Sequence, residues 1–100
     1  MFGLEHDTIA KINQVFSKFE NIEKVILYGS RAKENYRKGS DIDITLIGEK
    51  LNLNNSIYPI DEELEELNLP YTFDISIFSD IDNEDLKEHI KRVGKVFYQK

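Results

Sequence analysis

The sequence predicts a small α/β or α+β fold in which one β-sheet is covered by helices. Short strand-like segments alternate along the chain with segments whose apolar residues recur every three or four positions. That alternation is typical of a sheet with helices packed against it. The length of 100 residues matches one domain, spanning residues 1–100, and no repeat or linker divides it.

Composition and charge exclude several classes of protein. The chain has 13 basic against 19 acidic residues, a net charge of −6, which argues against binding nucleic acid directly through a broad basic face. Without cysteine there is no disulfide framework and no thiolate metal site. The longest apolar run, residues 25–28, is too short to span a membrane, and the first residues do not read as a signal peptide. We therefore expect a soluble, cytoplasmic protein.

Four segments have helical periodicity. The first covers residues 5–19, with Asp7 and Thr8 as candidate N-terminal caps, and a short second helix is expected from Arg31 to about residue 35. A third follows the cap-type residues 54–56 and runs to residue 67, with one apolar stripe and an acidic opposite side. The fourth is capped by Asp82 or Asn83 and closed by Gly94.

Four segments are expected to be strands. Residues 25–28 form an apolar run that ends at Gly29, which is typical of a buried strand. Residues 41–47 and residues 71–78 alternate apolar and polar positions, so each has one polar face. A short strand at residues 96–98 would close the sheet.

Asp41 and Asp43 form the first candidate site. Residues two apart on a strand point to the same side, so the two carboxylates would lie in parallel and repel each other unless a cation sits between them. Carboxylate oxygens with waters and phosphates are the ligands that Mg²⁺ or Mn²⁺ prefers. By itself such a pair is also common on the solvent face of a strand.

Gly29, Ser30 and Arg31 form a second candidate site, at the junction of a strand and a helix. A glycine lets the backbone approach a ligand, and the first N–H groups of a helix can bind a phosphate. Ser30 could donate its hydroxyl to the same anion and Arg31 could add a charged fork, although serine at such a position often only caps the helix. Together with the acid pair, this turn predicts a site for a metal-bound nucleoside triphosphate.

Asp74 is the candidate for a third acid. It lies in the middle of the alternating strand at residues 71–78, where aspartate is disfavoured without solvent or a partner. It could simply belong to a solvated face. The functional interpretation is that it joins Asp41 and Asp43 around two metal ions and acts as general base toward an incoming hydroxyl.

The motifs resemble the nucleotidyltransferase signature of the DNA polymerase beta superfamily. The matching residues are Gly29-Ser30-Arg31-Ala32, then Ser40-Asp41-Ile42-Asp43, and later Asp74 between hydrophobic neighbours. The likeness covers nearly the whole chain, and the small size is similar to the minimal nucleotidyltransferases of bacteria and archaea. One departure is Glu34, which stands where relatives often have glycine.

This resemblance implies a mixed sheet flanked by helices and a division of roles in the site. Gly29 and Ser30 would hold the triphosphate of ATP, Asp41 and Asp43 two Mg²⁺ or Mn²⁺ ions, and Asp74 would be the third ligand and the base. It also implies an enzyme that transfers NMP, most often AMP, to a hydroxyl on a separately encoded helical partner, the substrate-binding subunit. In toxin–antitoxin systems that partner is a HEPN-type toxin, which the nucleotidyltransferase silences. Homodimers and hetero-oligomers both remain open.

Two further hypotheses stay beside this one. The chain could be a non-catalytic module that senses nucleotide or neutralises its partner by contact, which the small size and acidic face favour. Alternatively, the acids could bind a single structural cation and no nucleotide. A basic cluster beside the turn could gather anionic nucleotide or simply be solvated; it consists of Arg31, Lys33, Arg37 and Lys38.

Overall fold

Four strands and four α-helices follow one another in the computed structural model, which describes residues 1–34, 37 and 41–100. The strands are β1 (Ile22–Tyr28), β2 (Ile42–Gly48), β3 (Phe73–Ile77) and β4 (Lys95–Gln99). The helices are α1 (His6–Ser17), α2 (Ser30–Lys33), α3 (Tyr58–Glu66) and α4 (Glu84–Val93). A π-helical turn, η1 (Leu53–Ile57), leads into α3, and a 3-10 turn, η2 (Phe78–Asp80), follows β3.

The strands form one mixed sheet in the order β3-β2-β1-β4. β1 pairs antiparallel with both β2 and β4, whereas β2 and β3 are parallel. A parallel pair needs a crossover connection, and the segment containing η1 and α3 supplies it. The expected α+β fold with a mixed sheet is therefore confirmed.

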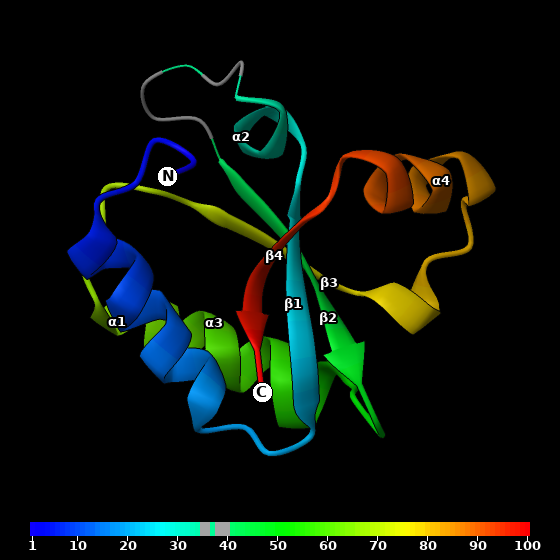
Figure 1. Ribbon diagram of the computed structural model, residues 1–100. Helices are drawn as coiled ribbons and strands as arrows, with labels where there is room; N and C mark the ends of the chain where they lie inside the picture. The colour runs from blue at the N-terminus through cyan, green and yellow to red at the C-terminus, as the bar shows by residue number, and fades with distance from the viewer. Residues whose placement is uncertain (35–36, 38–40) are drawn as a thin grey trace.

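The two faces of the sheet have different coverings (Figure 1). On one face, Val25 and Leu27 are fully buried in the core, where the ring of Phe16 from α1 meets that of Phe97 from β4 edge-on at 6.4 Å. Figure 1 shows α1 and α3 on this side and α4 on the other. Because successive strand residues alternate, Ile26 faces α4, and it lies directly against Gly94.

Several boundaries differ from the sequence predictions. α1 begins at His6 after Glu5, so neither Asp7 nor Thr8 is its N-cap, and no side-chain bond caps it. Residues 53–57 form a π-helical turn before α3, and the side chain of Asn52 caps this turn by accepting from Asn55 N–H. Among the described residues, no helix is long and apolar enough to cross a membrane.

Gly94 ends α4, as expected, for a reason that differs from the usual one. Its φ of −62° and ψ of 145° are extended, so the left-handed conformation that usually favours glycine after a helix is not needed here. Instead, a Cβ at this position would collide with the Ile90 carbonyl and the Ile26 side chain. The absence of a side chain at Gly94 thus lets the backbone between α4 and β4 lie directly against Ile26 of the sheet.

Candidate active site

The turn between β1 and α2 places Gly29 and Ser30 at the end of a buried strand. Gly29 has φ of 77°, a left-handed conformation that side chains rarely adopt, and the chain turns there directly into α2. A Cβ on Gly29 would collide with the Oδ2 atom of Asp43. The turn that the sequence predicts to bind phosphate therefore lies in contact with one of the predicted metal ligands.

The structure places the three predicted acids on one side of the sheet. Asp43 in β2 and Asp74 in β3 are paired positions of the parallel register, so their side chains project side by side. Asp41 stands two residues before Asp43 and shares its side, and the hydroxyl of Thr72 donates to its carboxylate. Ser40, the residue before this pair in the motif, lies outside the described residues.

Electrostatic repulsion is concentrated on Asp43. This carboxyl is half-buried, and burial raises its pKa above the usual 3.8, with further increases from the neighbouring charges of Asp74 and Asp41. Desolvation and like charges both disfavour the ionised form. In the free protein, the charges of Asp74 and Asp41 therefore destabilise the ionised form of Asp43, and a bound cation would remove this repulsion.

A family model described as "Polymerase beta, Nucleotidyltransferase" matches residues 10–100. The chain belongs to the polymerase beta nucleotidyltransferase family. It is accordingly a nucleotidyltransferase. None of the curated proteins matches the chain at a significant level.

Solved structures with low sequence identity share this nucleotidyltransferase fold. A toxin–antitoxin structure with AMP-PNP has a TM-score of 0.73 at 18% identity, covering 97% of this chain and 75% of the other. A chain from the complex of tri-AMPylated Shewanella oneidensis HEPN toxin with MNT antitoxin has a TM-score of 0.70 at 15% identity, covering 97% and 74%. A Sulfolobus solfataricus protein described as a nucleotidyltransferase has a TM-score of 0.58 at 22% identity, covering 98% and 92%.

Arg31 has partners other than the expected phosphate. It is only 2% exposed, its guanidinium donates to the Phe2 carbonyl at 2.8 Å, and it lies over the Tyr71 ring at 4.9 Å. The guanidinium thereby ties the N-terminal turn and the segment before β3 to α2. The predicted role of Arg31 in the nucleotide site is not tested by these contacts and stays a prediction.

Two further polar residues lie on the same face, and the site predicted from the sequence includes neither of them. Tyr28 pairs with Asp43 across β1 and β2, which puts Tyr28, Asp43 and Asp74 in one row, and Ser76 lies two residues after Asp74. The sequence pattern predicts Tyr28 as part of an apolar strand. Only the register between β1 and β2 shows that it faces the acids, and the sequence pattern does not give that register.

The chemistry of the three carboxylates fits a hard divalent cation, although their side chains are not arranged as a ready-made metal site. Asp41, Asp43 and Asp74 offer oxygen ligands of the kind that Mg²⁺ prefers, on one side of the sheet. Within the described part of the chain, no group of three His, Asp or Glu side chains is already arranged to hold a metal ion.

Proposed function

We propose that the chain transfers AMP from ATP to a hydroxyl group of a separately encoded helical protein and releases pyrophosphate. The observation that carries this proposal is the contact of the Gly29 turn with Asp43, beside Asp74 in the same register row. Such a turn and such carboxylates are what a triphosphate with divalent ions needs. Among the neighbours that share the fold, one structure contains AMP-PNP and another contains an AMPylated HEPN toxin with an MNT antitoxin.

The turn would bind the β- and γ-phosphates of ATP. α2 has only four residues, so we assign this role to the backbone N–H groups and the Ser30 hydroxyl more than to a helix dipole. Gly29 leaves the space in which phosphate can approach both the backbone and Asp43. Because the substrate is ATP, the reaction belongs in the cytoplasm.

Asp41 and Asp43 would hold the divalent ions, with Asp74 as third ligand and general base. Bound ions supply positive charge to the phosphates and favour ionisation of the acceptor hydroxyl. The acceptor oxygen forms a bond to the α-phosphorus while the bond from that phosphorus to the bridging oxygen breaks, and pyrophosphate leaves with the electron pair. The hydroxyl proton passes to the Asp74 carboxylate, which is exposed and therefore accessible to an acceptor.

Transfer of label tests this proposal. The protein is incubated with Mg²⁺, ATP labelled at the α-phosphate and a HEPN-type helical protein, and label on the acceptor is measured. We expect Asp41→Asn and Asp74→Asn each to reduce labelling by at least about 100-fold, as general-base and metal-ligand losses do. Asp80→Asn is the matched control, because Asp80 is an exposed acid in η2, outside the register row. Equal labelling by wild type and Asp41→Asn would contradict the proposal.

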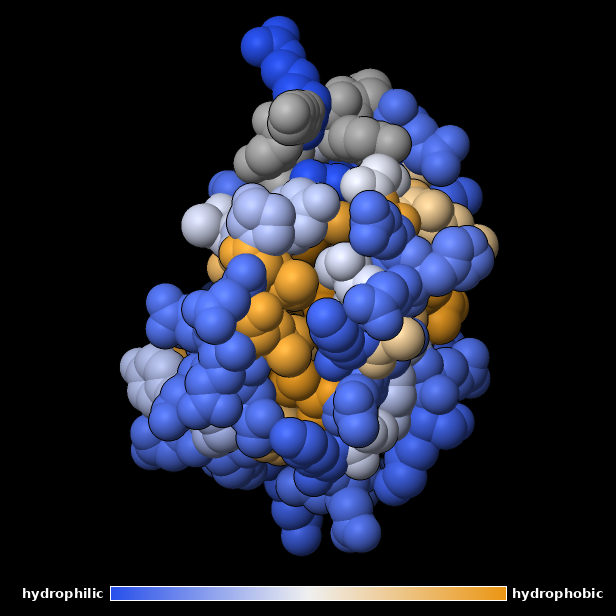
Figure 2. Space-filling view, turned by 90° about the vertical axis from the view of Figure 1, so that its left-hand side faces the viewer, coloured by the Kyte–Doolittle hydropathy of each residue, from blue (hydrophilic) through white to orange (hydrophobic). Residues whose placement is uncertain are grey.

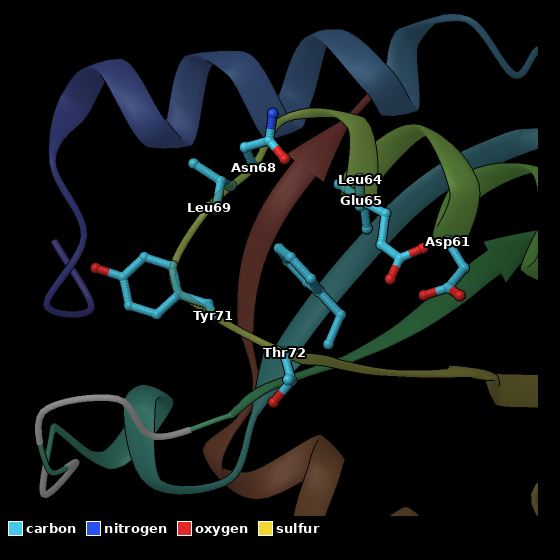
Figure 3. A pocket seen from close by; sticks show the side chains of 8 residues that line it. Asp61, Leu64, Glu65, Asn68, Leu69, Tyr71 and Thr72 are labelled. Atoms are coloured by element: carbon cyan, nitrogen blue, oxygen red, sulfur yellow. The ribbon is translucent and has the colours of Figure 1, made fainter.

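A second function, neutralisation of the partner by contact, is favoured by the surface around α3. This helix carries five acidic residues and no basic one. A cavity of about 350 Å³ lies between α3 and the start of β3, with Asp61, Glu65, Tyr71 and Thr72 on its walls (Figure 3). Figure 2 shows a hollow of apolar side chains surrounded by hydrophilic ones on the face that is at the left in Figure 1. A partner with basic and apolar groups would suit this side of the molecule.

The Asp74→Ala variant separates the two functions. If transfer alone controls the partner, this variant should bind the helical protein and leave it active. If contact is sufficient, the variant should suppress the partner as fully as the wild type while transferring no AMP. Partner activity and complex formation by size-exclusion chromatography are the two measurements.

A further inference from the structure

We infer that the cavity at the start of β3 binds an arginine side chain of the acceptor protein and thereby brings the acceptor hydroxyl to Asp74. The cavity has a volume of about 350 Å³ and lies between α3 and residues 71–73. Sites that bind small ligands are commonly of this size. The inference rests on the proposed function, because it names the part of the acceptor that the protein recognises.

The direction of attack places the acceptor at the edge of the sheet that β3 forms. In such a displacement, the attacking and leaving oxygens stand roughly in line on opposite sides of the phosphorus. The proposed phosphate turn follows β1, while Asp43 lies in β2 and Asp74 in β3, so pyrophosphate leaves on the β1 side. The acceptor therefore arrives from the β3 side. β3 is the outer strand in the order β3-β2-β1-β4, so no strand of the described sheet blocks this approach.

Thr72 joins the wall of the cavity to the acids. Its hydroxyl donates to the Asp41 carboxylate, and its carbonyl accepts from Ile42 N–H at 2.9 Å. Thr72 stands two residues before Asp74, which is about 7 Å along an extended chain. In Figure 3 the Thr72 side chain points away from α3, to the other side of β3. The cavity thus reaches the edge strand from the α3 side, close to the carboxylates on the opposite face.

The walls of the cavity combine two carboxylates with aromatic surface. Asp61 and Glu65 lie one helical turn apart on α3, and Figure 3 shows them across the cavity from Tyr71. Phe73 adds a second aromatic ring, and the Arg31 guanidinium, 4.9 Å from the centroid of the Tyr71 ring, restrains that ring from within the protein. A guanidinium from the acceptor suits such walls, because its planar fork can donate to carboxylates while its flat face packs on an aromatic ring.

Asp61 and Glu65 have no cationic partner within the part of the chain that the structure describes. The lysine that contacts α3, Lys18, bridges to Glu63 at 2.9 Å instead. Asp61 and Glu65 are both exposed, and like charges one turn apart on a helix repel each other. An arginine of the acceptor would remove this repulsion, whereas lysine offers a point charge without a planar surface. Charge and shape together therefore favour arginine.

The test measures AMP transfer from ATP labelled at the α-phosphate to the HEPN-type helical protein at increasing acceptor concentration. The full chain is compared with the double variant Asp61→Asn/Glu65→Gln, which should fold because both side chains are exposed. We expect the KM for the acceptor to rise about tenfold, since hydrogen bonds to a charged group are lost at a site that solvent partly screens. The KM for ATP should not change, whereas a merely structural role would change both.

Glu62→Gln/Glu66→Gln is the matched control. These two glutamates have the same spacing on the same helix and are exposed, but they do not line the cavity. An equal rise of the acceptor KM in both double variants would overturn the inference, because overall charge would then explain it. A rise in the KM for ATP alone would also overturn it, because the cavity would then bind the nucleotide. If wild type transfers AMP and the acceptor KM of Asp61→Asn/Glu65→Gln is unchanged, the inference is wrong while the proposed function stands.

A double-mutant cycle identifies the arginine of the acceptor. Surface arginines of the helical protein are replaced by lysine one at a time, and transfer is measured with wild type and with Asp61→Asn/Glu65→Gln. We expect one replacement to raise the acceptor KM with wild type and to add nothing with the double variant, since both changes remove the same contact. Additive effects at every arginine would overturn the inference.

A titration with N-acetylarginine methylamide provides a readout that needs no transfer. We expect it to shift the backbone amide NMR signals of Leu64, Leu69 and Phe73, which line the cavity, in wild type and not in Asp61→Asn/Glu65→Gln. The citrulline analogue has nearly the same shape without the charge and should cause no such shift. If wild type transfers no AMP, the proposed function fails, and the titration then decides the cavity: arginine-specific shifts support a guanidinium site, and their absence overturns it.

Discussion

Gly29 is the residue at which backbone conformation and site chemistry depend on each other most closely. Its φ of 77° favours glycine, and the space that a side chain would fill is already occupied by Oδ2 of Asp43. The backbone conformation of Gly29 affects the stability of the fold, and the closeness of Asp43 affects the site. Substitution at this position should therefore affect both.

We predict that Gly29→Ala lowers the free energy of unfolding by about 1–3 kcal/mol, the usual cost of a disfavoured backbone conformation. It should also reduce AMP transfer by about 100-fold, because Asp43 must move away from the new methyl group and small misplacements of reacting groups have effects of that size. Denaturant unfolding and the labelling assay measure the two effects.

Gly3→Ala is the matched control for this prediction. Gly3 also has a positive φ, 73°, and it is exposed in the N-terminal turn. We expect a similar loss of stability with full transfer activity. If Gly29→Ala keeps wild-type transfer in conditions where it is folded, the contact with Asp43 has no functional meaning.

Asp43 should make the protein less stable as it ionises. Its pKa is raised above the ordinary 3.8 in the folded state, so folding favours the protonated form. This contribution to stability is fully present below about pH 3.8 and is lost as the pH rises through the folded-state pKa. At neutral pH the ionised Asp43 consequently works against the fold.

We predict that Asp43→Asn is more stable than wild type at pH 7, by roughly 1 kcal/mol or less since solvent screens the charges. The advantage should disappear near pH 4, and Mg²⁺ should stabilise wild type more than the variant. Urea unfolding at several pH values measures this. Asp80→Asn, a neutralisation at an exposed acid, is the control. A variant that is less stable than wild type at pH 7 would contradict the repulsion described above.

At the scale of elements, α4 is the helix that covers the site face of the sheet. It begins after Asn83, whose side chain accepts from Leu86 N–H at 3.1 Å, and it packs on Tyr28 through His89 and against Ile26 at Gly94. The first turn contains Glu84 and Asp85, which favour the positive end of the helix. The start of α4 is thus defined by one side-chain bond.

We predict that Asn83→Ala destabilises the protein by about 1 kcal/mol, the usual loss for an N-cap. Asp82→Ala, one residue earlier, should have little effect, because the cap bond of α4 comes from Asn83. Thermal unfolding of both variants measures the difference. Equal midpoints would show that packing alone determines where α4 begins.

The elements were largely predictable, and their pairing was not. Periodicity located the α1, α3 and α4 helices and the four strands, because burial on one face produces a pattern in the sequence. The parallel pairing that puts Asp43 beside Asp74 depends on two segments about thirty residues apart, for which a single sequence carries no signal. Tyr28 was missed for the same reason. The role of Arg31 in the nucleotide site stays a prediction, since a guanidinium can serve packing as readily as phosphate binding.

The whole molecule combines a sheet that has one buried apolar face with a site in which neighbouring carboxylates repel one another. The apolar face of the sheet, covered by α1 and α3, contains fully buried residues such as Val25, Leu27 and Ile44. The opposite face holds three acids on neighbouring strands in a chain whose net charge is already −6. A cation that binds there removes repulsion and adds ligand bonds, so we expect the folded state to be stabilised more by metal and nucleotide together than by either alone.

We predict that Mg²⁺ with a non-hydrolysable ATP analogue, at about 100-fold above the dissociation constant, stabilises wild type by about 2.7 kcal/mol. For a domain of this size that corresponds to a rise of roughly 10–20 °C in the unfolding midpoint. Asp41→Asn should lose most of this rise, and so should wild type with the analogue in EDTA, because each lacks the cation that joins the phosphates to the carboxylates. Asp7→Asn, an exposed acid on α1 paired with Lys11, should behave like wild type. Differential scanning calorimetry decides the matter: an equal rise in Asp41→Asn and wild type would show that the nucleotide binds without these carboxylates.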